Sequence, residues 1–108
     1  MTAVLMRQGD KRPIFGQAFA IPPATITITA GATASLYDAG GVLIINAAIV
    51  TGYDAGALTS PRVWYVLDTS TLAPGWYSLR FSVPALGSDG IARMLQIDVN
   101  VEVTTAQL

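Results

Sequence analysis

The residues of this sequence that could do chemistry are mainly its carboxylates, because the chain contains no histidine and no cysteine. Histidine is the commonest general base and metal ligand, and cysteine supplies thiol chemistry, so sites of both kinds are ruled out. Asp38, Asp54, Asp68 and Asp89 fall at expected turns, where their oxygens could bind calcium. However, aspartate also favours turns through hydrogen bonds to its own backbone, and no D-x-D-x-D spacing is present. We therefore expect these residues to form turns, and we expect no metal and no other cofactor.

No catalytic motif accompanies the carboxylates. The G-x-S-x-G, H-E-x-x-H and nucleotide-loop patterns are all missing from the sequence. Glycoside hydrolysis would need two acids across a cleft, and the single glutamate, Glu102, lies near the end of an alternating segment. Gly40 and Gly41 lie between two expected strands, which marks a turn rather than a phosphate loop. We expect the protein not to be an enzyme.

The aromatic residues are the second group of side chains that could have a function. The segment WYSLRFSV places Trp76 and Arg80 on its wetter face, and RVWYVLD places Arg62 and Trp64 on one face. If these segments are neighbouring strands of one sheet, both tryptophans stand on its outer face, with Arg80 in cation–π range. Tryptophan and arginine anchor protein interfaces, so these four residues are candidate interface residues. Alternatively, Trp64 is a core tryptophan, or one of the rings packs beneath a loop.

Alternating apolar and polar residues predict the strands that would position these side chains. In WYSLRFSV the apolar face begins with Tyr77, which we expect in the core with its hydroxyl bonded to nearby backbone, because a buried tyrosine needs a partner. Asp-Ala-Gly-Gly at 38–41 and Asp89-Gly90 within 85–90 predict hairpin turns, and 51–61 predicts a loop. The expected strands are 24–29, 32–38, 42–50, 62–68, 76–84 and 91–103.

The last of these strands shows the clearest alternation. Its apolar residues are Leu95, Ile97, Val99, Val101 and Val103, and Gln96, Asp98, Asn100 and Glu102 face the other way. No amphipathic helix is indicated anywhere. Short strands at this spacing favour a β-sandwich, with a closed barrel as the main alternative.

The first 23 residues are the least regular part. We expect 1–23 to be an N-terminal arm that reaches a neighbouring subunit or an edge strand that ends near Pro22-Pro23, and 24–108 to be the folded unit of a single domain. No apolar run is long enough to cross a membrane, and the start lacks the basic region of a signal peptide.

Composition points to contacts with other proteins. Apolar residues make up 52% of the chain and charged residues only 12%, and the net charge is −1. Average soluble domains carry about 25% charged residues, and a near-neutral surface promotes association. Alanine and glycine inflate the apolar count, so an ordinary stable monomer is the alternative. No basic stripe is present to neutralise phosphates, so we expect no nucleic-acid binding.

Two segments carry a resemblance to known proteins. LAPGWYSLRFSV followed by SDGIARMLQIDVNVEV resembles the last two strands of immunoglobulin-like sandwiches, in which a G-x-Y element, here Gly75-Trp76-Tyr77, forms a tyrosine corner. ITITAGATASLYDAGGVLIINAAIVTG resembles a hairpin of small structural proteins of tailed phages, including decoration, baseplate and tail accessory domains. The resemblance covers 24–103 and implies an all-β, immunoglobulin-like antiparallel β-sandwich of about seven to eight strands.

The function that this resemblance implies is structural. The protein would be a non-enzymatic component of a phage virion, made in the host cytoplasm, and its place in the head or the tail stays open. Its partners would be copies of itself, or a capsid or tail protein. The alternative is a carbohydrate-binding module with Trp64, Trp76 and Tyr37 as a stacking platform. Such a platform needs nearby polar groups to bind sugar hydroxyls, and the flanking outward residues offer only serines and one arginine. A bacterial adhesin repeat is a third reading, normally found in long tandem chains.

Overall fold

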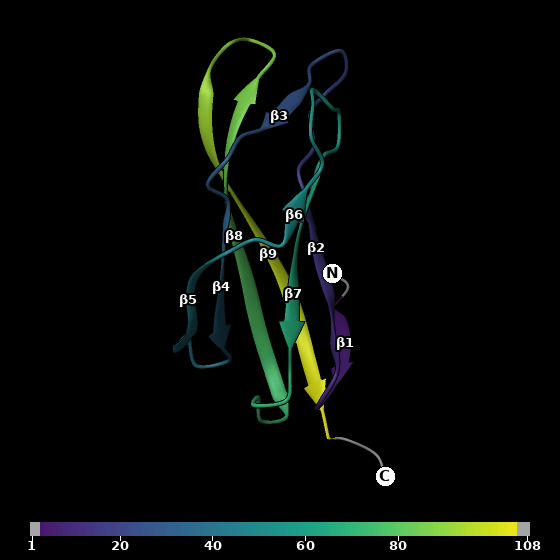
Figure 1. Ribbon diagram of the computed structural model, residues 1–108, viewed down its shortest axis with the longest axis vertical. Coiled ribbons are helices and arrows are strands. Elements are labelled where there is room, and N and C mark those ends of the chain that lie inside the picture. The colour runs from purple at the N-terminus through teal and green to yellow at the C-terminus, as the bar shows by residue number, and fades with distance from the viewer. Residues whose placement is uncertain (1–2, 106–108) are drawn as a thin grey trace.

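The computed structural model describes residues 3–105, which form β-strands joined by turns and loops (Figure 1). A six-stranded sheet has the order β1-β9-β8-β4-β5, with β3 also pairing with β8, and a three-stranded sheet has the order β2-β7-β6. The expectation of an all-β fold is therefore confirmed. Across the described residues no helix could span a membrane. The strands are β1 (Val4–Arg7), β2 (Lys11–Gln17), β3 (Ile26–Ile28), β4 (Thr33–Asp38), β5 (Leu43–Ile49), β6 (Gly52–Tyr53), β7 (Arg62–Asp68), β8 (Gly75–Gly87) and β9 (Ala92–Thr104).

A long hairpin of β8 and β9 runs along the molecule, whose longest dimension is 50 Å (Figure 1). The two strands pair from Gly75 opposite Val103 to Leu86 opposite Ala92. The turn expected at 85–90 is shorter than predicted, because β8 continues past Pro84 while β9 pairs on one side and β3 on the other. The remaining tight turn uses Gly90 at a φ of +80°, which glycine adopts without strain.

The core lies between the two sheets and follows the predicted alternation. Phe81 and Leu79 of β8 are fully buried, as are Val63 and Leu67 of the smaller sheet. All five apolar residues predicted for the inner face of β9 either lie in this core or pack against it. Period-two alternation therefore identified the buried face correctly, since successive side chains in a strand point to opposite sides.

Tyr77 confirms the prediction of a buried tyrosine with a backbone partner. Its side chain is buried, and its hydroxyl donates a 2.7 Å hydrogen bond to the carbonyl oxygen of Ala73. This bond fixes the connection 69–74 against the start of β8.

Replacing Tyr77 with phenylalanine removes this hydrogen bond and keeps the ring. We expect Tyr77→Phe to lower the free energy of unfolding by about 0.5–1.5 kcal/mol, because the ring packing is retained while the Ala73 carbonyl loses its partner. Urea denaturation measures this loss. An unchanged midpoint would mean that water replaces the hydroxyl without cost.

The N-terminal residues form two strands that belong to different sheets. Val4–Arg7 (β1) runs parallel to β9, and Lys11–Gln17 (β2) pairs antiparallel with β7. The expectation of a purely antiparallel sandwich is therefore wrong, because β1 makes the larger sheet mixed. Both β1 and β2 therefore pair with strands of their own chain. Residues 1–2 lie outside the described part.

The β4–β5 hairpin has the predicted turn. The carboxylate of Asp38 accepts hydrogen bonds from the backbone N–H groups of Gly40 and Val42, both at 2.9 Å, and Gly41 has a φ of +81°. After β5, the expected loop 51–61 contains the two-residue strand β6. No described strand pairs with the outer edge of β5, which leaves that edge open.

Candidate functional site

Arg62 and Trp64 lie on the outer face of the smaller sheet. Trp64 is half-buried beside Phe15, at a ring-centroid distance of 5.7 Å, and the Arg62 guanidinium carbon lies 5.2 Å from the Phe15 centroid. The Trp64 ring also covers Gly52, where a Cβ would come within 2.6 Å of it. Arg62 pairs with Asp54 at 3.2 Å, and this hydrogen bond lowers the pKa of Asp54. Trp64 is therefore neither a core residue nor a free platform.

Trp76 and Arg80 lie on the other sheet, on the outer face of β8. Trp76 is half exposed, and Arg80 hydrogen-bonds Asp98 of β9 at 2.9 Å, which raises the pKa of Arg80. The guanidinium carbon of Arg80 lies 5.5 Å from the centroid of Tyr37 rather than over a tryptophan.

The expectation that both tryptophans share one sheet face is therefore wrong. Trp64 belongs to β7 in the three-stranded sheet and Trp76 to β8 in the six-stranded sheet. The four predicted interface residues form two separate pairs on opposite outer faces, because the inner faces of both sheets meet in the core. An interface role for these pairs stays a prediction.

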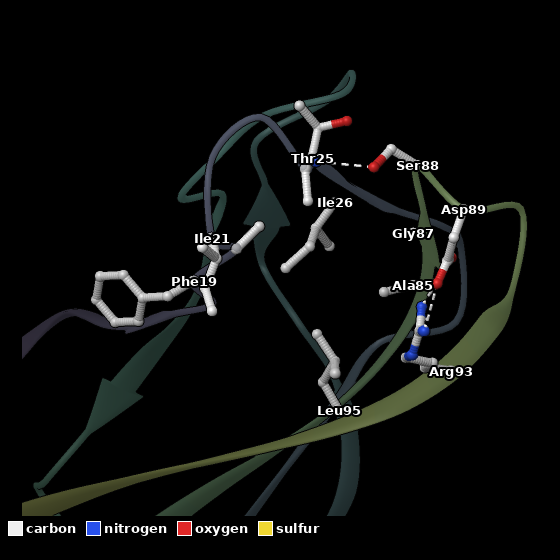
Figure 2. A pocket seen from close by; sticks show the side chains of 12 residues that line it. Phe19, Ile21, Thr25, Ile26, Ala85, Gly87, Ser88, Asp89, Arg93 and Leu95 are labelled. Carbon is white, nitrogen blue, oxygen red and sulfur yellow. Dashed lines mark hydrogen bonds and ion pairs between the residues drawn. The ribbon is translucent and has the colours of Figure 1, made fainter.

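An apolar hollow of about 340 Å³ lies near the turn of the β8–β9 hairpin, beside β3 and the segment that leads to it (Figure 2). Ile21, Ile26 and Leu95 point into the hollow, whereas Phe19 points outward beside it (Figure 2). A hydrogen bond of 3.1 Å from the Thr25 backbone N–H to the Ser88 hydroxyl borders it. The site is thus an apolar depression with a short polar rim, and it differs from the site expected from the sequence.

The hollow is surrounded by apolar side chains that face solvent. Phe19 is 72% exposed and Ile21 is 86% exposed. Backbone hydrogen bonds from Ala18 and Ala20 to the loop before β7 hold this segment in place. Leu58 and Ile91 are also exposed at this end, whereas Leu86 and Met94 are exposed on the opposite face of the hairpin from Ala85 and Leu95. Large apolar patches on a protein surface typically mark interaction sites, and we name this hairpin end, with its hollow, the apolar end.

The rim of the apolar end carries an ion pair between Asp89 and Arg93 at 2.6 Å. The Arg93 guanidinium and the backbone N–H of Ile91 both donate to the carboxylate, and they lower the pKa of Asp89 from 3.8 to about 2. The pair brackets the hairpin turn and fixes the side of the hollow formed by β9.

The Asp89–Arg93 pair gives a prediction about pH. Because folding lowers the pKa of Asp89, its contribution to stability is present above the unfolded value near 4 and is lost as the pH falls toward 2. We expect Arg93→Ala to move the pKa of Asp89 back toward 3.8, as measured by carboxyl NMR titration. Arg62→Ala on the other sheet is the matched control and should leave Asp89 unchanged. A pKa that stays near 2 in Arg93→Ala would contradict the assignment.

The remaining turn aspartates have local partners. Asp68 accepts from the backbone N–H and the hydroxyl of Ser70, which lower its pKa, and Asp38 caps its own turn. Between residues 3 and 105 no group of three or more carboxylates is positioned to hold a metal ion. These contacts match the turn-forming role that aspartate prefers.

Sequence reasoning missed the apolar end, although one signal was present. Ile91 is a large apolar residue outside the inward-facing apolar set of 91–103, and it is exposed. Phe19 and Ile21 lie in the segment that gave no regular pattern. Their proximity depends on the folded loop, which local alternation does not reveal.

Comparison with known proteins identifies the fold only. No protein-family model matches the sequence, and no curated protein is significantly similar to it. A family 123 glycoside hydrolase from Clostridium perfringens, studied for glycolipid glycan hydrolysis, is structurally similar, with a TM-score of 0.52 and 14% sequence identity. The match covers 97% of this chain and 23% of that enzyme's chain. At this identity the similarity shows that the two-sheet fold recurs as part of a larger protein.

Proposed function

We propose that this protein is a non-enzymatic structural component of a phage virion that assembles with copies of itself through the apolar end. The observation that carries the proposal is the pairing of an outward-pointing Phe19 with an adjacent apolar hollow of about 340 Å³. An exposed ring beside an apolar hollow allows a self-complementary contact, because two copies related by a two-fold axis can each place Phe19 in the other's hollow. Burial of these side chains supplies the driving force.

Two further features support association. The edge of β5 that faces away from β4 is open, and Val42, Leu43, Ile44 and Ile49 are exposed along this segment. Open apolar edges are sites where further chains can pair. The sequence from Ala39 to Tyr53 carries no charged residue that would oppose this.

We propose in addition that the two-sheet fold is of the immunoglobulin-like kind. The hydrogen bond from Tyr77 to the Ala73 carbonyl supports this, since a tyrosine at a strand start that bonds backbone a few residues upstream is typical of that fold. The resemblance of residues 24–103 to small structural proteins of tailed phages supports a place in the virion, as a decoration, baseplate or tail accessory protein.

The solution mass of the purified protein tests the proposal. Light scattering over a wide concentration range should give a discrete oligomer whose population grows with concentration, because apolar association follows mass action. A mass of one chain at every concentration would contradict self-assembly. Binding of that monomer to a capsid or tail shell would then replace copies of itself as the partner.

A further inference from the structure

Two aromatic residues, Tyr37 and Trp76, lie on the outer face of the larger sheet. Tyr37 of β4 lies opposite Ser78 of β8, and Trp76 is two residues along β8 on the same face. Residues in this diagonal relation are about 7–8 Å apart, within reach of aromatic side chains. Trp76 is 52% exposed. The face therefore presents an aromatic surface that the core does not use.

Polar side chains of β9 lie beside Trp76 and Arg80 on β8, whereas Tyr37 lies on the other side of β8. Glu102 lies opposite Trp76, Asn100 opposite Ser78 and Asp98 opposite Arg80. The Arg80–Asp98 pair is 42% and 51% exposed, so both groups can still reach a ligand.

A hollow of about 360 Å³ is lined by Tyr37, Ser78, Arg80 and the β4–β5 turn. The distance from Trp76 to Arg80 along the extended strand is about 13 Å, from about 3.3 Å per residue. This length suits an oligosaccharide better than a single sugar. We define Tyr37, Trp76, Arg80 and Asp98 as the aromatic–polar face.

We propose that the aromatic–polar face binds a neutral glycan chain. The apolar C–H face of one sugar ring stacks on Trp76, and hydroxyls of a neighbouring sugar bond to the Arg80–Asp98 pair, where Asp98 accepts and Arg80 donates. Hydrogen bonds to charged groups are the stronger kind, and sites for small ligands combine apolar surface with a few polar groups in this way. A neutral ligand is favoured because Arg80 is already paired and Glu102 adds negative charge.

A glycan suits this face better than a protein partner does. Serine, aspartate and glutamate are depleted in protein interfaces, and all three types surround Trp76 here. The platform differs from the one expected from the sequence, because Trp64 lies on the other sheet and β9 supplies polar groups that were not considered there. The proposal does not depend on assembly through the apolar end.

Tryptophan fluorescence tests the site directly, because the chain has two tryptophans, Trp64 and Trp76. In the Trp64→Phe variant, Trp76 is the only tryptophan. We expect its emission to change saturably with at least one of cellohexaose, chitohexaose, xylohexaose and maltohexaose at millimolar concentration. The Trp76→Phe variant, which retains Trp64, should show no change of emission.

Calorimetry on the otherwise natural chain separates the contributing groups. We expect Trp76→Ala to remove measurable binding of the responding oligosaccharide, and Arg80→Ala to weaken it about tenfold through loss of a charge-assisted hydrogen bond. Arg62→Ala, an outward arginine on the other sheet, is the matched control and should bind normally.

Two results would overturn the proposal. The first is no saturable response to any of the four oligosaccharides. The second is binding of the responding oligosaccharide that persists in Trp76→Ala. A Phe19→Ser, Ile21→Ser variant should bind glycan normally even when self-association is lost, so the failure of one proposal is distinguishable from the failure of the other.

Discussion

Replacing Phe81 with alanine is expected to lower the free energy of unfolding by about 3–5 kcal/mol, the largest effect of any substitution considered. Phe81 is fully buried and is the largest of the fully buried side chains in the described part of the core. It pairs with Ala34 on one side and Ile97 on the other. Ala34 is too small to fill the space that the ring leaves, so Phe81→Ala opens a cavity in the core. Such a loss is a large fraction of the stability of an ordinary small domain.

Urea denaturation followed by circular dichroism measures this effect. Ser82→Ala, the next residue of β8 with its side chain on the outer face, is the matched control and should change stability by less than about 0.5 kcal/mol. A cost below about 1 kcal/mol for Phe81→Ala would contradict a core centred on this ring.

The second large effect concerns Gly16, where the smaller sheet approaches the larger one. A Cβ at this position would lie 2.8 Å from Cδ2 of Phe81 and 3.0 Å from Cγ2 of Ile97. We expect Gly16→Ala to lower the free energy of unfolding by about 1–3 kcal/mol, because one methyl group overpacks a closed core.

A double-mutant cycle distinguishes this clash from a backbone effect. Phe81→Leu removes the ring atoms nearest to Gly16, so the Gly16→Ala, Phe81→Leu double variant should lose less stability than the two single variants add up to. The matched control is Gly9→Ala, a turn position with open space around its Cβ position but a φ of +91°, whose cost should not depend on Phe81. Additive losses at Gly16 and Phe81 would show that the close approach is not what excludes a side chain.

Local patterns in the sequence predicted the strands and their faces well. The segment 62–68 was predicted as a strand and is β7, and Tyr77 is buried with the expected backbone partner. The turn at Asp38 was also predicted. These features depend on alternation and on turn residues, which act over a few positions.

Pairing between distant strands was predicted less well. RVWYVLD and WYSLRFSV look like neighbours in sequence, yet β7 pairs with β2 and β6, and β8 pairs with β9 and β4. The short connection 69–74 leads from one sheet to the other, and nothing in its composition distinguishes that path from a hairpin. The position of Trp64 was wrong for this reason.

The candidate sites depend even more on long-range contacts. Ile21 and Leu95 are far apart in sequence and meet only because β3 pairs with β8 and the preceding segment bonds the loop before β7. The polar groups beside Trp76 come from β9, whose register against β8 becomes evident only once the hairpin is formed. Alternation within one strand predicts the sheet face on which a side chain lies, but it does not predict which residues of other strands lie next to it.

The central claim is that the apolar end joins copies of this chain, and sedimentation equilibrium on matched variants tests it most directly. The double variant Phe19→Ser, Ile21→Ser removes the exposed Phe19 ring and the Ile21 side chain that lines the hollow. Trp76→Ser removes an exposed aromatic side chain on a different face. We expect the first variant to have the mass of a single chain at concentrations where the natural chain and Trp76→Ser form the same oligomer. An oligomer that survives Phe19→Ser, Ile21→Ser but is lost in Trp76→Ser would contradict this account and place the interface on the larger sheet.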